Sequence, residues 1–279
     1  MIFAMSNIAW LPEERHEAYA ALADAGFAGL EIAPGLLFAG AEDPMRPDEG
    51  RVRDVRTELE NHGLGLVSMQ SLLFGVDDAA LFGSEEQRGR FDTAMHRAID
   101  LAGRLHIPNI VFGSPRQRVI PADVDDSHAH ERAVATFGAL ANRASEAGTV
   151  IAMEPNPADY GTNFLTTLEE AASFVASVDH PALRLNFDLG AVIMNGDGDR
   201  AADLARTFIS HIHHVHVSEP ELAPAPADPT PVASVLRVLE QGGYDGAVSI
   251  EMRRDAERGV VAVRDSIAAL VRASERRAA

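Results

Sequence analysis

Eight short runs of apolar, β-prone residues recur along the chain, and polar segments rich in Ala, Glu and Arg separate them. The separating segments carry helix signals: the first begins with Pro12 and acidic residues and ends at Gly26. Another has the spacing of a capping box, from Thr167 to Glu170. Strands that alternate with helices pair in parallel. The eight runs cover residues 2–8, 27–33, 64–70, 109–114, 149–155, 182–188, 212–218 and 247–252.

Eight strand–helix units in 279 residues match an α/β fold of one kind, the (β/α)₈ or TIM barrel, which typically takes about 250 residues. A doubly wound sheet is the alternative, but its strands would not number eight so regularly. No Gly/Ser linker or break in composition interrupts the pattern. We therefore expect residues 1–279 to form a single TIM-barrel domain.

Composition excludes several classes of function. The net charge of −18 disfavours nucleic acid as a partner, because such binding depends on Lys and Arg neutralising phosphates. The chain has no Cys, which excludes disulfides and thiolate chemistry. It has no Lys either, which excludes Schiff-base aldolases and pyridoxal phosphate enzymes. The start of the chain lacks the basic residues of a secretory signal, and no stretch has the roughly 20 apolar residues of a membrane span, so we expect a cytoplasmic protein that contacts no membrane.

The seventh run, "HIHHVHVSE" at residues 211–219, holds four of the eleven histidines. Its alternation places His214 and His216 on one face of a strand and two valines on the other. His211 and His213 are expected to face the opposite way or to lie outside the strand, and to be structural. An imidazole that points into a barrel needs a polar partner, which other strands must supply.

The carboxyl ends of the last four predicted strands supply such partners. In a TIM barrel the active site forms at these ends. Run five ends in "MEPNP" with Glu154, run six in "NFDLG" with Asp188, run seven carries His216, and run eight ends in "SIEMR" with Glu251. One such residue alone would more often be a solvated group or the partner of an arginine. Four at equivalent points of successive units indicate a shared site.

Three carboxylates in a barrel mouth cost several kcal/mol each unless they are paired or neutralised. One divalent cation bound by Glu154, Asp188, His216 and Glu251 would neutralise them together. Oxygen ligands with one histidine suit Mn²⁺, Mg²⁺ or Co²⁺, with Zn²⁺ as a further alternative. We interpret His214, two residues earlier, as a supporting residue rather than a ligand.

The other strand ends and the loops after them offer residues for a small-molecule pocket, since they combine apolar side chains with a few polar groups. Arg116 and Arg118 could also meet a phosphate, but no Gly-rich phosphate loop follows strand seven or eight, so a phosphorylated substrate is not favoured. The predicted substrate-binding residues are Trp10, Glu31, Gln70, Ser114, Arg116, Asn156 and Arg253.

The Glu/Asp/His/Glu set on strands five to eight resembles the xylose isomerase-like superfamily of TIM barrels, and the eight-unit order extends the resemblance over nearly the whole chain. That superfamily includes ketose 3-epimerases, hydroxypyruvate isomerase and inosose dehydratase. The resemblance implies that Glu154 and Glu251 are the catalytic acid/base pair in addition to binding the metal, and that Asp188 and His216 are ligands only. Two positions differ: Ala191 and Leu222 stand where the epimerases have a His and an Arg that hold the substrate.

The expected function is a divalent-metal-dependent isomerase or epimerase of a sugar or sugar derivative, working by proton transfer through a metal-stabilised enediolate. A lyase or dehydratase that acts on a keto-sugar or glycoside with the same metal site is the first alternative. A non-catalytic barrel that binds a sugar or a metal is the second. The expected partner is a small sugar, and a homo-oligomer stays open.

Overall fold

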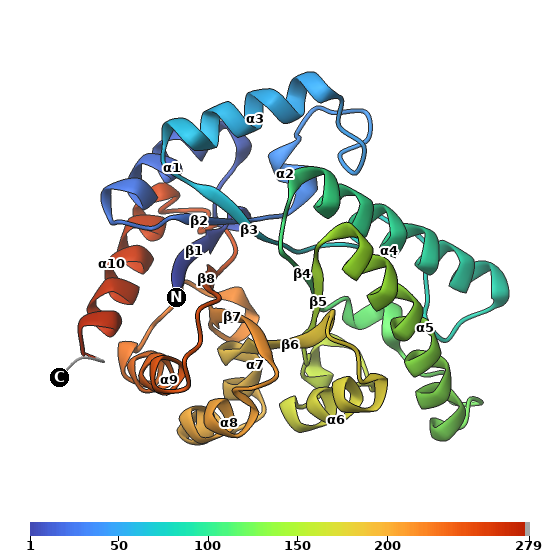
Figure 1. The fold of residues 1–279 in the computed structure, drawn as a ribbon. Helices are drawn as coiled ribbons and strands as arrows, with labels where there is room; N and C mark the ends of the chain where they lie inside the picture. Colours follow the sequence, from blue (N-terminus) through green and yellow to red (C-terminus); the bar gives the residue numbers. More distant parts are fainter. Residues whose placement is uncertain (277–279) are drawn as a thin grey trace.

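Eight parallel strands form a closed barrel in the computed structural model, which describes residues 1–276 (Figure 1). Each strand pairs with its neighbours in chain order, and β1 closes the barrel against β8. The prediction of a single (β/α)₈ barrel is confirmed, and the doubly wound alternative is excluded. The strands are β1 (Ile2–Ser6), β2 (Gly29–Ile32), β3 (Gly65–Met69), β4 (Asn109–Phe112), β5 (Val150–Met153), β6 (Leu183–Asp188), β7 (Ile212–Ser218) and β8 (Ala247–Glu251).

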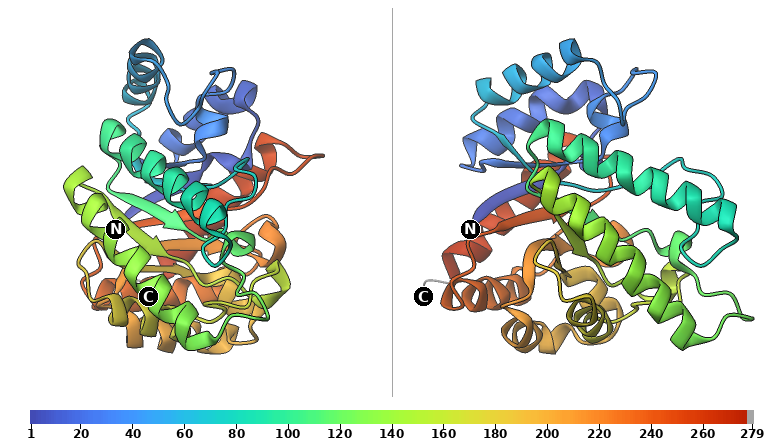
Figure 2. Two further views of the ribbon diagram at one scale, coloured as in Figure 1. Left: turned by 90° about the vertical axis from the view of Figure 1, so that its right-hand side faces the viewer. Right: turned by 45° about the vertical axis from the view of Figure 1, so that its right-hand side comes forward.

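Helices surround the strands, and the two longest, α4 and α5, lie side by side on the outside of the barrel (Figure 2). Side-chain caps start several of them, among them Ser84 at α4 and Asp125 at α5. The helices are α1 (Arg15–Asp24), α2 (Pro34–Leu37), α3 (Glu49–Asn61), α4 (Glu85–Leu105), α5 (Asp126–Ala147), α6 (Leu168–Val178), α7 (Leu189–Met194), α8 (Ala201–Phe208), α9 (Pro229–Gln241) and α10 (Val260–Arg276). Within the described residues, six 3₁₀ turns, η1 to η6, lie in the loops at Asn7–Ala9, Pro12–Glu14, Pro115–Arg118, Ala158–Tyr160, Gly198–Arg200 and Pro220–Leu222.

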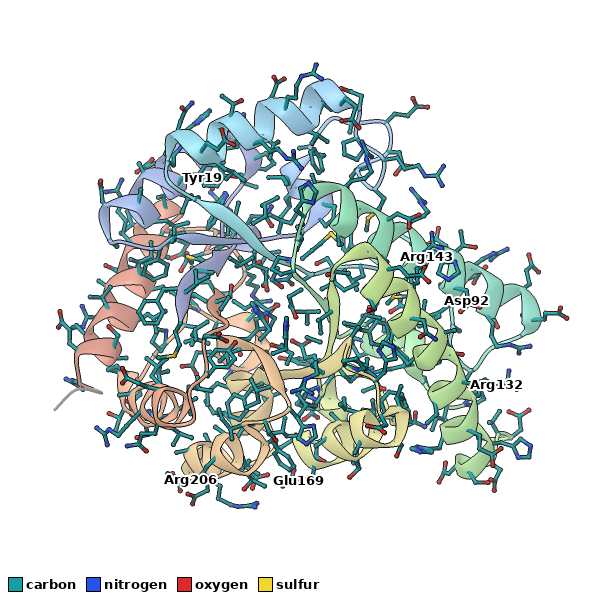
Figure 3. All side chains as sticks on the ribbon, in the orientation of Figure 1. Tyr19, Asp92, Arg132, Arg143, Glu169 and Arg206 are labelled. Carbon is teal, nitrogen blue, oxygen red and sulfur yellow. The ribbon has the colours of Figure 1, made fainter. Side chains whose placement is uncertain are left out.

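The apolar core lies between the strands and the surrounding helices. The part between α4, α5 and β4 is aromatic: Phe112 and Phe137 have ring centroids 5.0 Å apart, and Phe91 packs edge-on against Phe112. Charged side chains project from the outer faces of the helices, such as Arg206 and Glu169 in Figure 3. None of the helices described over residues 1–276 is both long and apolar enough to cross a membrane.

A β-bulge interrupts the pairing of β6 with β7, because Leu185 is opposite Ile212 whereas Asn186 is opposite His214. The extra residue is His213. Its Nδ1 lies 2.8 Å from Oδ1 of Asn109 on β4, at the amino-terminal end of the barrel. The expectation that His213 faces away from His214 was therefore wrong, because the bulge breaks the alternation on which it depended. Beyond the bulge, His214 and His216 both point into the barrel.

Candidate metal centre

Four strand ends bring Glu154, Asp188, His216 and Glu251 together at the carboxyl-terminal mouth of the barrel. Glu154 directly follows β5, and Asp188 and Glu251 are the last residues of β6 and β8. In the strand register Asp188 is opposite His216, whereas Glu251 lies two residues beyond Ser249, the residue of β8 that is opposite His216.

Each carboxylate reaches the same nitrogen atom. Nδ1 of His216 lies 3.0 Å from Oε1 of Glu154, 3.2 Å from Oε2 of Glu251 and 3.5 Å from Oδ2 of Asp188. One donor atom from each residue lies within 4.8 Å of all the others. Three carboxylate oxygens and one imidazole nitrogen are the kinds of ligand that Mn²⁺, Mg²⁺ or Co²⁺ would take. This donor set fits a divalent cation.

Two uncharged side chains fix the orientation of the carboxylates. Asn186 donates a hydrogen bond of 2.7 Å to Oε1 of Glu154. Ser218 donates one of 2.8 Å to Oδ1 of Asp188, which also accepts from the backbone N–H of Ala191 and so caps α7. This arrangement leaves Oδ2 of Asp188 facing the other donors. Asn186 and Ser218 were not predicted, although each lies two residues from a predicted ligand on the same face of a strand.

Glu31 lies deeper in the barrel than the four donors. It is a residue of β2, and its side chain is fully buried. Both of its carboxylate oxygens are 3.1 Å from Nε2 of His216, and Oε2 is 2.7 Å from Nε2 of His214. Glu31 borders none of the cavities described over residues 1–276, so this placement does not support the predicted contact with substrate.

Trp10 also lies away from the mouth. Its side chain is only 3% exposed and packs edge-on against Tyr19 of α1, with ring centroids 6.1 Å apart. It does not line any cavity described over residues 1–276. The interpretation of Trp10 as a substrate contact is therefore replaced by a role in the core, since sequence position after a strand does not fix the direction of a side chain.

Two cavities adjoin the four donors, and together they contain the other predicted substrate contacts. One, of about 420 Å³, is bordered by Glu154, Asp188 and Glu251, and the other, of about 470 Å³, by Glu154 and Glu251. The predicted residues in their walls are Ser114, Asn156 and Arg253 for the first and Gln70, Ser114 and Arg116 for the second. Tyr160, Glu219 and Glu221 also border the first and were not predicted. Their loops have no strand pattern from which a direction could be read.

Arg118 does not reach either cavity. Its guanidinium is fully buried above the ring of Phe112 and near Sδ of Met153, and burial lowers its pKa to about 10. It is therefore unable to meet a phosphate on a substrate, whereas Arg116 borders the second cavity.

The charges of the cluster shift the pKa values of its members. Burial raises the pKa of Glu251 to about 7, and the neighbouring Glu154 and Asp188 add to this shift although His216 opposes it. Burial alone would lower the pKa of His216, but the carboxylates of Glu251 and Glu31, with Asp188 and Glu154, raise it well above its usual value. Without a cation, the cluster therefore retains protons near neutral pH.

We expect the stabilisation by added metal to increase with pH. Glu251 and His216 both have raised pKa values in the folded protein, so their protons stabilise the metal-free fold at low pH and this contribution is lost as the pH rises towards and above 7. The same protons compete with a cation for the ligand atoms. Thermal unfolding at a fixed Mn²⁺ concentration should show a larger increase in Tm at pH 8 than at pH 5.5. An equal increase at both pH values would contradict this.

Comparison with known proteins gives one family and a set of similar folds. The family model described as xylose isomerase-like TIM barrel matches residues 19–273. No curated protein sequence matches the chain. Among solved structures, the 3-keto-D-glucoside 4-epimerase from E. coli is 21% identical with a TM-score of 0.76, covering 98% of this chain and 99% of that one.

Two further solved structures are similar over their whole length. The D-psicose 3-epimerase from Clostridium cellulolyticum H10 is 18% identical, with a TM-score of 0.77 and 99% of both chains covered. An L-ribulose 3-epimerase is 18% identical with a TM-score of 0.75, and the match covers 100% of this chain and 96% of that one. At these identities the likeness establishes the fold.

Proposed function

Since the chain belongs to the xylose isomerase-like TIM barrel family, we propose that it is a divalent-metal-dependent isomerase or epimerase of a sugar or sugar derivative. One observation carries the proposal: the donor atoms of Glu154, Asp188, His216 and Glu251 converge on one point beside two cavities of sugar size. The similar folds of several sugar epimerases support the same class of reaction.

The proposed chemistry assigns different tasks to the four residues. A bound cation would stabilise the negative charge that develops on the substrate when a proton leaves the carbon beside its carbonyl. Glu154 and Glu251 come from β5 and β8, on either side of the other two strands, and both border the two cavities. One would remove the proton and the other would return a proton from the opposite face, which inverts the carbon. Asp188 and His216 would hold the cation.

The charge of the cavity walls favours an uncharged sugar. The first cavity is bordered by Glu219 and Glu221 in addition to the cluster, and Arg253 is its only cationic residue over the described part of the chain. That arginine is 4.0 Å from Glu221, which offsets its charge. Ala191 and Leu222 add apolar surface to the same wall. A phosphate or carboxylate placed here would meet mostly like charge.

We expect a sugar with a free carbonyl to exchange the adjacent proton with solvent in the presence of the protein and Mg²⁺. Proton NMR in D₂O would measure it across ketoses and keto-glycosides, with chelator-treated protein as the control. Each sugar would be paired with its phosphorylated form, for which slower exchange is expected.

Two results would contradict the proposal in different ways. Release of water or of an aglycone without return of the proton would identify a lyase on the same metal site. Saturable binding of a sugar without any exchange would identify a non-catalytic barrel.

A further inference from the structure

The buried carboxylate of Glu31 faces the edge of His216 that points away from the candidate metal. Its two oxygens are each 3.1 Å from Nε2, whereas Nδ1 of the same ring faces Glu154, Asp188 and Glu251. An imidazole that gives its Nδ1 lone pair to a cation carries its proton on Nε2. That N–H then needs an acceptor, and Glu31 is the acceptor in reach.

The position of Glu31 is itself fixed from two further strands. Nε2 of Gln70 donates hydrogen bonds of 2.8 Å to Oε1 of Glu31 and 2.7 Å to Oγ of Ser6. On the other side, Nε2 of His214 is 2.7 Å from Oε2, although the angles at this contact are not those of a hydrogen bond. The ring of His214 stands edge-on to that of His216, with centroids 5.1 Å apart. The imidazole of His216 is thus held in position by packing and by charge.

We propose that Glu31 is a positioning residue that sets the orientation and proton placement of His216 and thereby the affinity of the protein for its divalent cation. The inference rests on the metal site of the proposed function, and it does not depend on which sugar reacts. It also identifies Gln70 as a link, because this side chain borders the second cavity and contacts Glu31.

The alternative to a supporting role for Glu31 is a second metal site. Glu31, His214 and His216 have donor atoms within 4.8 Å of one another, so they could hold a cation themselves, with His216 bridging two ions. All three side chains are at most 1% exposed, and Glu31 already accepts from Gln70. These observations favour a hydrogen-bonded support for one ion over a second ion.

The test compares Mn²⁺ binding by the wild-type protein, Glu31→Gln and Glu31→Leu, with free Mn²⁺ measured by electron paramagnetic resonance. Glutamine keeps an oxygen for the Nε2 proton but removes the charge, and leucine removes both. Loss of a hydrogen-bonding partner behind a metal ligand typically weakens metal binding about 10- to 100-fold. We therefore expect one Mn²⁺ per chain in the wild type, roughly 10-fold weaker binding in Glu31→Gln and about 100-fold weaker binding in Glu31→Leu.

The control is His213→Gln, which changes an imidazole on the same strand that contacts Asn109 instead of the cluster. Its affinity for Mn²⁺ should match that of the wild type. Unchanged affinity in Glu31→Gln, whose side chain has the same size and keeps the fold measurable, would overturn the inference. Binding of two ions per wild-type chain would overturn it as well. Failure of every sugar to react would leave these binding results unaffected and would count only against the proposed reaction.

Discussion

Glu154→Gln and Glu251→Gln should each lower turnover by about 10²-fold or more while the protein still binds its metal, because positioned general acids and bases typically contribute factors of this size. A glutamine retains one oxygen for a cation but cannot accept a proton. The neighbours of Glu154 should tolerate the change to glutamine. Asn156 and Asn186 each have a side-chain oxygen with no hydrogen-bond partner among residues 1–276. Rotation of either side-chain amide would let that oxygen accept a hydrogen bond from the new glutamine.

The measurement is metal content by mass spectrometry together with turnover of the sugar found in the exchange assay. Glu169→Gln provides a control, because it removes one carboxylate from α6, on the outside of the barrel, and should leave both quantities unchanged. Normal turnover in the two cluster variants with metal bound would limit Glu154 and Glu251 to the role of ligands.

Asp188→Asn should act through loss of the metal instead. Oδ1 of Asp188 accepts hydrogen bonds from Ala191 and Ser218, so an asparagine would keep its oxygen there and preserve the cap of α7. Its NH₂ group would then replace Oδ2 and face the cation. We expect Mn²⁺ affinity to fall by about 100-fold or more, the upper end of what even indirect changes at metal sites produce.

Activity of Asp188→Asn should return in part at high Mn²⁺, whereas that of Glu154→Gln should not. His216→Gln offers a second ligand variant, since it keeps a polar side chain in the interior. Calorimetric titration with Mn²⁺ would measure the affinities. If Asp188→Asn bound Mn²⁺ as the wild type does, Asp188 would not be a ligand, and the proposed metal site would lose one of its four members.

The sequence predicted the positions of residues correctly where a strand pattern ends at a defined residue. The run at residues 182–188 became β6 at Leu183–Asp188, and its last residue faces the mouth as expected. The same reasoning brought Glu154, His216 and Glu251 to one place, because parallel strands of a barrel end at one face. The roles of these residues as ligands and catalysts stay predictions.

How deep a side chain lies in the barrel, and which way it points, could not be predicted from the sequence in this way. Glu31 lies within β2, beside a bulge between Leu30 and Glu31, so its side chain faces the layer beneath the mouth. His213 was misplaced because a second bulge adds one residue to β7. A strand pattern gives the face of each residue only while the alternation is unbroken. The loop after β1 has no such pattern, so nothing in the sequence indicated that Trp10 turns towards α1.

The candidate metal ligands all come from β5 to β8, whereas the second cavity is formed largely by residues 70–77 and 111–117, around the ends of β3 and β4. Substitutions in the loops after β3 and β4 can therefore change the shape of this cavity without removing a candidate metal ligand. Glu31 and Gln70 limit this freedom, because they connect the first half to His216.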